Sequence, residues 1–215
     1  MSVAESNVNP APETAQAVDL GTAPARSRAE TRRRLLEAAV ALFAENGLHG
    51  VTSAQIARRA RVAAGTFYLH FADKEALFRE IAFAALAELR ARQERASVGL
   101  VPGSREYLRA RTEELIAFAA EQRELILMVF GRAESAGLAD QVREAVVPEI
   151  QRWLERRAKE GLAPADLHPA VAAQAHAAVL TRVIAWWAAE PSRATPQQVV
   201  ETLLRMNPSL LPAAG

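Results

Sequence analysis

Apolar residues recur at the 3.6-residue period of an α-helix in almost every segment from about residue 28 onward. No segment shows the strict alternation that is typical of a half-buried strand. Of the 215 residues, 47 are alanine, a composition that favours helices and lets them pack closely through small side chains. The sequence therefore predicts an all-α fold.

Capping residues, glycine and proline divide this pattern into separate helices. The expected helices cover residues 28–45, 53–60, 63–70, 74–101, 104–120, 123–133, 139–159, 166–189 and 196–206. Pro148 is expected to kink or split the helix over 139–159, because proline lacks the N–H that a helix interior needs. Residues 1–26 have hardly any bulky apolar side chains, and we expect a disordered tail there.

Composition excludes several classes of protein. The chain has no cysteine, which rules out disulfide scaffolds, thiolate zinc sites and cysteine nucleophiles. No long uncharged apolar stretch suits a membrane span, and the N-terminus has no export-signal pattern, so we expect a cytoplasmic protein. His168 and His176 lack companion carboxylates at metal-ligand spacing, and no catalytic or phosphate-loop motif occurs. We therefore expect no metal, no cofactor and no enzymatic activity.

The net charge of +1 conceals an uneven distribution. Residues 1–25 carry three acidic residues and no basic ones, whereas residues 26–80 carry ten Lys or Arg against six Asp or Glu. Residues 81–215 carry sixteen residues of each sign. A polyanion would accordingly bind near residues 26–80.

Residues 52–71, which read TSAQIARRARVAAGTFYLHF, predict two short helices joined by a tight turn. One set of apolar residues has the spacing to pack these helices together and against Phe43: Ile56, Ala57, Val62, Phe67 and Phe71. The other face of the second helix is rich in hydrogen-bonding groups. Such a helix suits insertion into the major groove of DNA.

The stretch TRRRLLEAAVALFAENGLHGVTSAQIARRARVAAGTFYLHFADKEALF, residues 31–78, closely resembles the N-terminal domain of TetR/AcrR-family transcriptional repressors. The resemblance implies an N-terminal three-helix helix-turn-helix domain and a C-terminal helical bundle that binds an effector and dimerises. It divides the chain into a tail (1–26), a DNA-binding domain (27–73) and an effector-binding and dimerisation domain (74–212). The implied partners are a double-stranded DNA operator, a second copy of the chain and a small-molecule effector.

The resemblance also implies which residues face DNA. Thr52 and Ser53 would hold a phosphate at the start of the first motif helix. Tyr68, His70 and Lys74 would donate mostly to phosphates. These contacts set the register of the protein on DNA.

Three positions depart from the pattern of the family. Arg61 occupies a turn position where glycine is frequent, so a left-handed backbone there would cost roughly 1 kcal/mol. Ala63 stands where a capping hydroxyl is common, and Ala64 replaces a polar side chain that often reads a base. Reading of bases would then depend on Thr66, Leu69 and Arg61, with Gly65 letting the backbone approach closely.

These residues could also have purely structural roles. Tyr68 could belong to the core, and Lys74 could pair with a carboxylate. Arg58 and Arg59 fit a solvated face as well as a phosphate contact. Arg26 and Arg28 fit a frayed tail better than a minor-groove arm.

The C-terminal half is less specific. Residues suited to an effector pocket are Tyr107, Phe118, Phe130, Trp153 and His176, with Trp186 and Trp187 as further aromatic residues. Plain core packing explains each of them equally well, and Arg182 fits either a dimer interface or an anionic effector. We expect a repressor released from a palindromic operator by a small apolar or amphipathic effector. The alternative is a constitutive DNA-binding dimer without small-molecule control.

Overall fold

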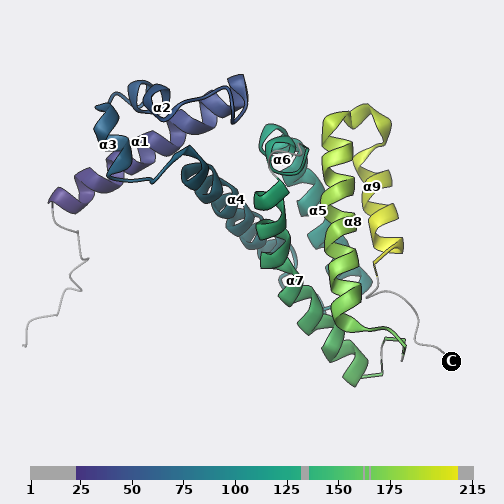
Figure 1. Cartoon of the computed structure of the whole chain (residues 1–215). Coiled ribbons are helices and arrows are strands. Elements are labelled where there is room, and N and C mark those ends of the chain that lie inside the picture. Colours follow the sequence, from purple (N-terminus) through teal and green to yellow (C-terminus); the bar gives the residue numbers. More distant parts are fainter. Residues whose placement is uncertain (1–22, 132–135, 162, 165, 208–215) are drawn as a thin grey trace, which may run out of the picture.

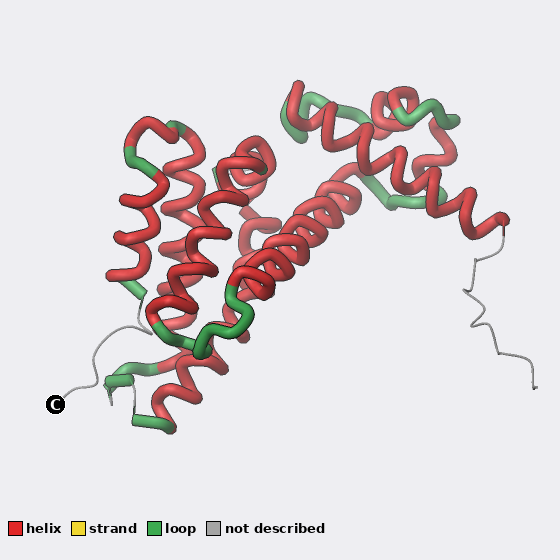
Figure 2. Tube along the Cα trace, turned by 180° about the vertical axis from the view of Figure 1, so that it is seen from behind, coloured by secondary structure: helices red, strands yellow, loops and turns green. Residues whose placement is uncertain are grey.

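The computed structural model describes residues 23–131, 136–161, 163–164 and 166–207. These residues form nine α-helices, one short 3-10 helix and no strand, which confirms the all-α prediction (Figure 2). Most of the predicted tail, residues 1–22, lies outside the described residues. Residues 23–26 were predicted to belong to that tail, but they form the first turn of a helix.

The N-terminal part consists of α1 (Ala23–Asn46), α2 (Ser53–Arg59) and α3 (Ala64–Tyr68). A capping box starts α2: the Thr52 hydroxyl accepts from the backbone N–H of Gln55, and the Gln55 side chain accepts from the backbone N–H of Thr52. This reciprocal pairing explains why the predicted start at residue 53 is correct.

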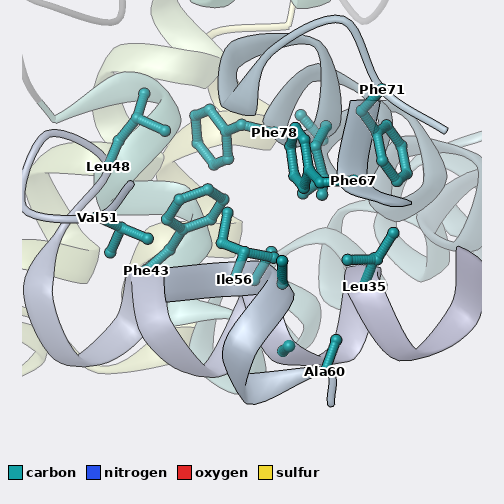
Figure 3. Packing of buried hydrophobic residues seen from close by; sticks show 14 of the residues in the cluster. Leu35, Phe43, Leu48, Val51, Ile56, Ala60, Phe67, Phe71 and Phe78 are labelled. Atoms are coloured by element: carbon teal, nitrogen blue, oxygen red, sulfur yellow. The ribbon is translucent and has the colours of Figure 1, made fainter. Parts of the chain in front are cut away.

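Large side chains from all three helices and from the next helix fill the interior of this part (Figure 3). Leu35, Phe43, Ile56, Phe67 and Phe78 each expose no more than 1% of their surface. The rings of Phe43 and Phe78 meet edge to face, with centroids 5.5 Å apart. The predicted packing of the two motif helices against Phe43 is thus confirmed.

A long helix, α4 (Lys74–Ala96), runs from this N-terminal part into the rest of the molecule (Figure 1). The Asp73 carboxylate caps it by accepting from the N–H of Ala76 at 2.6 Å. The following helices are α5 (Arg105–Glu121) and α6 (Arg123–Phe130). The last two residues of the segment predicted as helix over 123–133 lie outside the described residues.

Two long helices and one short one complete the fold. They are α7 (Ala136–Lys159), α8 (Pro169–Ala189) and α9 (Pro196–Arg205), with the 3-10 helix η2 (Pro191–Arg193) between the last two. Pro148 lies inside α7, which continues through it, so the predicted split does not occur. Packing against α8 can offset the one helical hydrogen bond that proline removes.

Side chains from the C-terminal helices form two further apolar clusters, one joining α5, α6, α8 and α9 and one joining α7 and α8. Figure 1 shows α8 and α9 side by side, on the side of the bundle away from α4. The indole N–H of Trp187 donates to the carbonyl of Ala194 at 2.8 Å, which ties α8 to the start of α9. No described helix is long and apolar enough to cross a membrane.

Candidate nucleic-acid interface and effector cavity

The turn between α2 and α3 contains a left-handed residue at Arg61, where the family resemblance implies a position often taken by glycine. Arg61 has φ +56°, and it is the only non-glycine residue with positive φ among the described residues. The guanidinium of Arg34 donates to the carbonyls of Ala60 and Arg61. These hydrogen bonds help to offset the roughly 1 kcal/mol that the backbone conformation costs.

The face of α3 that points away from the core is exposed. Tyr68 exposes 62% and Leu69 73% of its surface, whereas the preceding residue, Phe67, is fully buried. Thr66 and His70 are partly buried at the edges of this face. The α3 face, Thr66, Tyr68, Leu69 and His70, is therefore held rigidly by Phe67 and open to a partner.

Small residues at the start of α3 leave its backbone accessible. Ala63 provides no side-chain cap, as expected, and Ala64 is exposed. A Cβ atom added to Gly65 would meet nothing within 4 Å. Packing within the chain therefore gives no reason for a glycine here, whereas close approach of an external surface would.

At the start of α2, the hydroxyls of Thr52 and Ser53 differ in whether they are free to donate a hydrogen bond to a phosphate. The Thr52 hydroxyl donates to the side chain of Gln55 at 2.9 Å and accepts from its backbone, so its hydrogen bonds are already used. Ser53 is the first residue of α2 and is partly buried, and its hydroxyl makes no hydrogen bond to the described residues. Of the two predicted phosphate ligands, only Ser53 has a free side-chain donor.

Lys74 lies where α4 begins, but its ammonium points toward the loop after α1. It donates to the carbonyls of Leu48 and Val51 at 3.0 and 2.9 Å, and only 19% of its side chain is exposed. This geometry favours a structural role, because the loop carbonyls would otherwise lack a partner. The predicted phosphate contact of Lys74 stays a prediction.

His70 at the end of the α3 face has a lowered pKa. Burial is the main cause, and the positive charges of Arg28 and Arg32 add to it. Arg32 also donates to the carbonyl of His70 at 3.1 Å and pairs with Glu80 of α4. His70 is therefore neutral near pH 7 and would offer one N–H to a phosphate.

The arginines near the α3 face divide into paired and unpaired residues. Arg59 forms an ion pair with Glu45 at 2.9 Å, which favours the solvated-face interpretation. Arg58 and Arg61 are exposed and make no ion pair with the described residues. Arg26 and Arg28 lie on the first turns of α1, so they form neither the extended arm nor the frayed tail considered from the sequence.

A family model for bacterial regulatory proteins of the tetR family matches residues 35–81, from the middle of α1 into α4. This N-terminal part of the chain therefore resembles the corresponding region of tetR-family regulatory proteins. The matched family consists of bacterial transcriptional regulators.

The curated relatives each match only about a quarter of the chain. The regulator UidR of Escherichia coli K12 is 43% identical over 51 residues, which cover 24% of this chain and 26% of UidR. The chain thus matches about a quarter of the length of such relatives.

The likeness in structure extends further. FadR of Bacillus halodurans superimposes with a TM-score of 0.66 at 21% identity, over 83% of this chain and 94% of FadR. FadR of Bacillus subtilis, solved in complex with stearoyl-CoA, has a TM-score of 0.68 at 19% identity over 83% of this chain and 98% of its own. The likeness in fold therefore extends beyond the N-terminal region to the C-terminal helices.

A cavity of about 330 Å³ lies between the C-terminal helices. All five residues that the sequence predicts as effector ligands line it: Tyr107, Phe118, Phe130, Trp153 and His176. Trp187 belongs to the packed core instead, while Trp186 and Arg182 are exposed outside the cavity. The volume lies at the lower end of the range for small-molecule sites.

Sequence reasoning missed the polar part of the cavity wall. Arg90, Gln93, Arg111 and Glu149 form one network, in which the Gln93 amide donates to the carbonyl of Arg111 at 2.9 Å and its oxygen accepts from the Arg111 guanidinium at 3.3 Å. One signal could have revealed part of it, since Arg90 and Gln93 continue the helical spacing of the partly buried Leu86.

His176 belongs to α8 and lines the cavity. Its imidazole has no hydrogen-bond partner among the described residues. Burial lowers its pKa to about 4, because desolvation disfavours the charged imidazolium. The imidazole is therefore neutral near pH 7, with one donor and one acceptor nitrogen for a ligand.

Proposed function

We propose that the chain is a homodimeric, DNA-binding repressor that a small apolar or amphipathic effector releases from a palindromic operator. The observation that supports this proposal most strongly is the course of α4. Its first residues belong to the core of the DNA-binding domain through Leu77 and Phe78, and its later residues line the cavity. One rigid element therefore connects the two candidate sites.

DNA would contact the α3 face. Tyr68 is exposed and fixed against Phe67, with ring centroids 5.3 Å apart, so its hydroxyl is positioned for a phosphate. Leu69 and Thr66 would meet base edges or a thymine methyl. Arg61 and Arg58, both without an ion pair in the described structure, would add sequence-independent attraction.

The second copy would pack on α8 and α9. One stripe of α8 is exposed along the whole helix and consists of Val171, Ala175, Ala178, Arg182 and Trp186. Its apolar and small side chains suit the self-complementary interface of a two-fold dimer. Such a dimer would place two α3 helices about one turn of DNA apart, roughly 34–36 Å.

The effector would occupy the cavity and favour a dimer whose α3 helices no longer match the operator. Switching needs only a different affinity of the ligand for the two shapes, typically about 1–3 kcal/mol. The complex of Bacillus subtilis FadR with stearoyl-CoA supports an amphipathic effector for this chain. A fully packed C-terminal bundle would favour the constitutive alternative, in which no small molecule controls DNA binding. The presence of a cavity favours control by an effector instead.

Fluorescence polarisation with DNA from upstream of the chain's own gene tests the proposal, with scrambled DNA as the control and a series of salt concentrations. We expect specific binding of two chains per site, with an affinity that falls steeply as salt rises. Absence of binding at low salt would contradict the proposed function. Specific binding that no cavity ligand weakens would instead support the constitutive alternative.

A further inference from the structure

The polar residues of the cavity wall gather at one end of the bundle. On α4 the lining residues run from Ala82 and Leu86, near the DNA-binding domain, to Arg90 and Gln93, about 16 Å further along at 1.5 Å per residue. The wall of α4 therefore changes from apolar to polar along its length.

The neighbouring helices repeat this gradient. On α7 the lining begins with Val142 and Val146 and ends with Glu149, Trp153 and Arg156. The other lining residues with charged, imidazole or amide side chains lie in the first half of α5, in the first half of α8 and just after α9: Arg111, His176 and Asn207. Because α5 packs against α4 and α8 against α7 in the opposite direction (Figure 1), all of these groups lie at the end far from the DNA-binding domain.

The opposite end of the cavity is apolar and continuous with the core of the DNA-binding domain. Ala82, Val129 and Val142 line the cavity and also belong to the cluster that contains Phe43 and Phe67. A ligand that reaches this end would touch side chains packed directly behind the helix-turn-helix.

Charge at the polar end is positive and incompletely neutralised. Glu149 lies 3.7 Å from Arg90 and 3.5 Å from Arg111, both longer than a good charge-assisted hydrogen bond. Arg156 lines the same end without an ion pair to the described residues. The lining thus contains three guanidinium groups and one carboxylate, and two of the guanidinium groups, Arg90 and Arg111, lie 3.7 and 3.5 Å from that carboxylate.

We propose that the effector is an amphipathic carboxylate, whose head group pairs with Arg90 and Arg111 in place of Glu149 and whose apolar tail points toward the DNA-binding domain. This inference rests on the proposed function of the cavity. The two arginines already accommodate a carboxylate, so a second one needs no rebuilding of the site. The Glu149 side chain is 53% exposed and can leave toward solvent.

Contacts other than Glu149 fix the positions of Arg90 and Arg111. Arg90 donates to the carbonyl of Ala145 at 2.8 Å, and Arg111 contacts the oxygen of Gln93 and lies over the ring of Tyr107. These contacts remain when Glu149 leaves. A planar guanidinium fixed in this way binds a carboxylate with two donors at a small entropic cost.

The test compares decanoate with decan-1-ol, which share the tail and differ in the head, through quenching of tryptophan fluorescence in the full chain. We expect decanoate to bind roughly tenfold or more tightly. Arg111→Met should abolish this preference while leaving decan-1-ol binding unchanged. The matched control is Arg95→Met, because Arg95 is exposed on the same α4 helix as Arg90 but lies outside the cavity.

Glu149→Gln should have the opposite effect to Arg111→Met on the binding of decanoate. Removing the resident carboxylate should tighten decanoate binding roughly tenfold, without affecting decan-1-ol. Glu144→Gln, which alters an exposed residue of the same helix, should change neither. Arg90→Met serves as a second variant if Arg111→Met does not fold, and its expected effect is the same.

A further variant tests the direction in which the apolar tail of the effector points. Ala82→Leu fills the apolar end, so it should weaken dodecanoate much more than octanoate. Equal weakening of both would overturn the proposed orientation.

The outcomes separate this inference from the proposed function. If decan-1-ol binds as tightly as decanoate and both release DNA, the effector cavity stands and the carboxylate site is wrong. Decanoyl-CoA could bind far more tightly than decanoate, with Glu149→Gln changing the affinity of neither compound. In that case the head group does not bind at Arg90 and Arg111, and the inference is overturned. If none of these probes binds, the inference fails while operator binding, measured separately, still tests the proposed function.

Discussion

The DNA-binding domain and the C-terminal bundle use aromatic side chains in opposite ways. In the former, Phe43, Phe67 and Phe78 fill the interior completely. In the latter, Tyr107 and Trp153 border a cavity of about 330 Å³. The comparison indicates that the first domain is built to hold one surface rigid, whereas the second leaves space whose occupation can alter its packing.

The largest expected effect concerns the closed core. Phe67→Ala should lower the free energy of unfolding by about 3–5 kcal/mol, because it opens a cavity among fully buried neighbours. Phe130→Ala, at a partly buried position on the cavity between the C-terminal helices, should cost clearly less. Urea denaturation of both variants measures the difference. Equal losses would show that the two interiors are packed alike.

A second pair of variants compares two glycines between α4 and α5. A Cβ at Gly103 would lie 2.1 Å from the Trp153 ring, whereas one at Gly99 would meet nothing within 4 Å. Both residues have positive φ, at +83° and +77°. Gly99→Ala should therefore cost only about 1 kcal/mol, and Gly103→Ala roughly 2–4 kcal/mol. Thermal melts that rank them the other way would contradict the close packing of Trp153.

A third prediction concerns pH and the C-terminal bundle. The pKa of His176 is about 4 in the folded chain but near 6.5 when unfolded, so only the unfolded chain takes up this proton between these values. The free energy of unfolding should therefore fall as pH decreases from about 6.5 to 4, by at most about 3 kcal/mol from this group. Denaturation at several pH values measures the slope, which His176→Gln should reduce. An unchanged slope in that variant would assign it to other groups.

The smallest expected effects distinguish structural from DNA-contacting residues. Lys74→Met should lower stability by about 1–2 kcal/mol, because the carbonyls of Leu48 and Val51 lose their donor. Tyr68→Phe should leave stability unchanged and weaken binding to all DNA similarly. The measurements are urea denaturation and a salt series of DNA binding. If Lys74→Met instead keeps full stability and lowers the salt slope by about one, the phosphate contact predicted from the sequence is correct.

The DNA-binding domain was largely predictable because its structure depends on local rules. The capping residue Thr52 follows from neighbouring residues, whereas the left-handed turn at Arg61 and the uncapped start at Ala63 follow from the resemblance to the TetR/AcrR family. The inward side of α3 follows from the spacing of Phe67 and Phe71. Lys74 is different, because its partners lie 23 and 26 residues away in a loop whose carbonyls carry no sequence signal.

By itself, the sequence determined the helices and the motif, and it offered the large side chains of the C-terminal half equally as cavity lining and as plain core. Periodicity, caps and bulky residues act over a few residues, so one chain segment contains the information. Only the tertiary structure decided that a cavity exists and that Arg90, Arg111 and Glu149 meet at one end of it. That meeting depends on the directions in which α4, α5 and α7 pack, and no segment taken alone contains those directions.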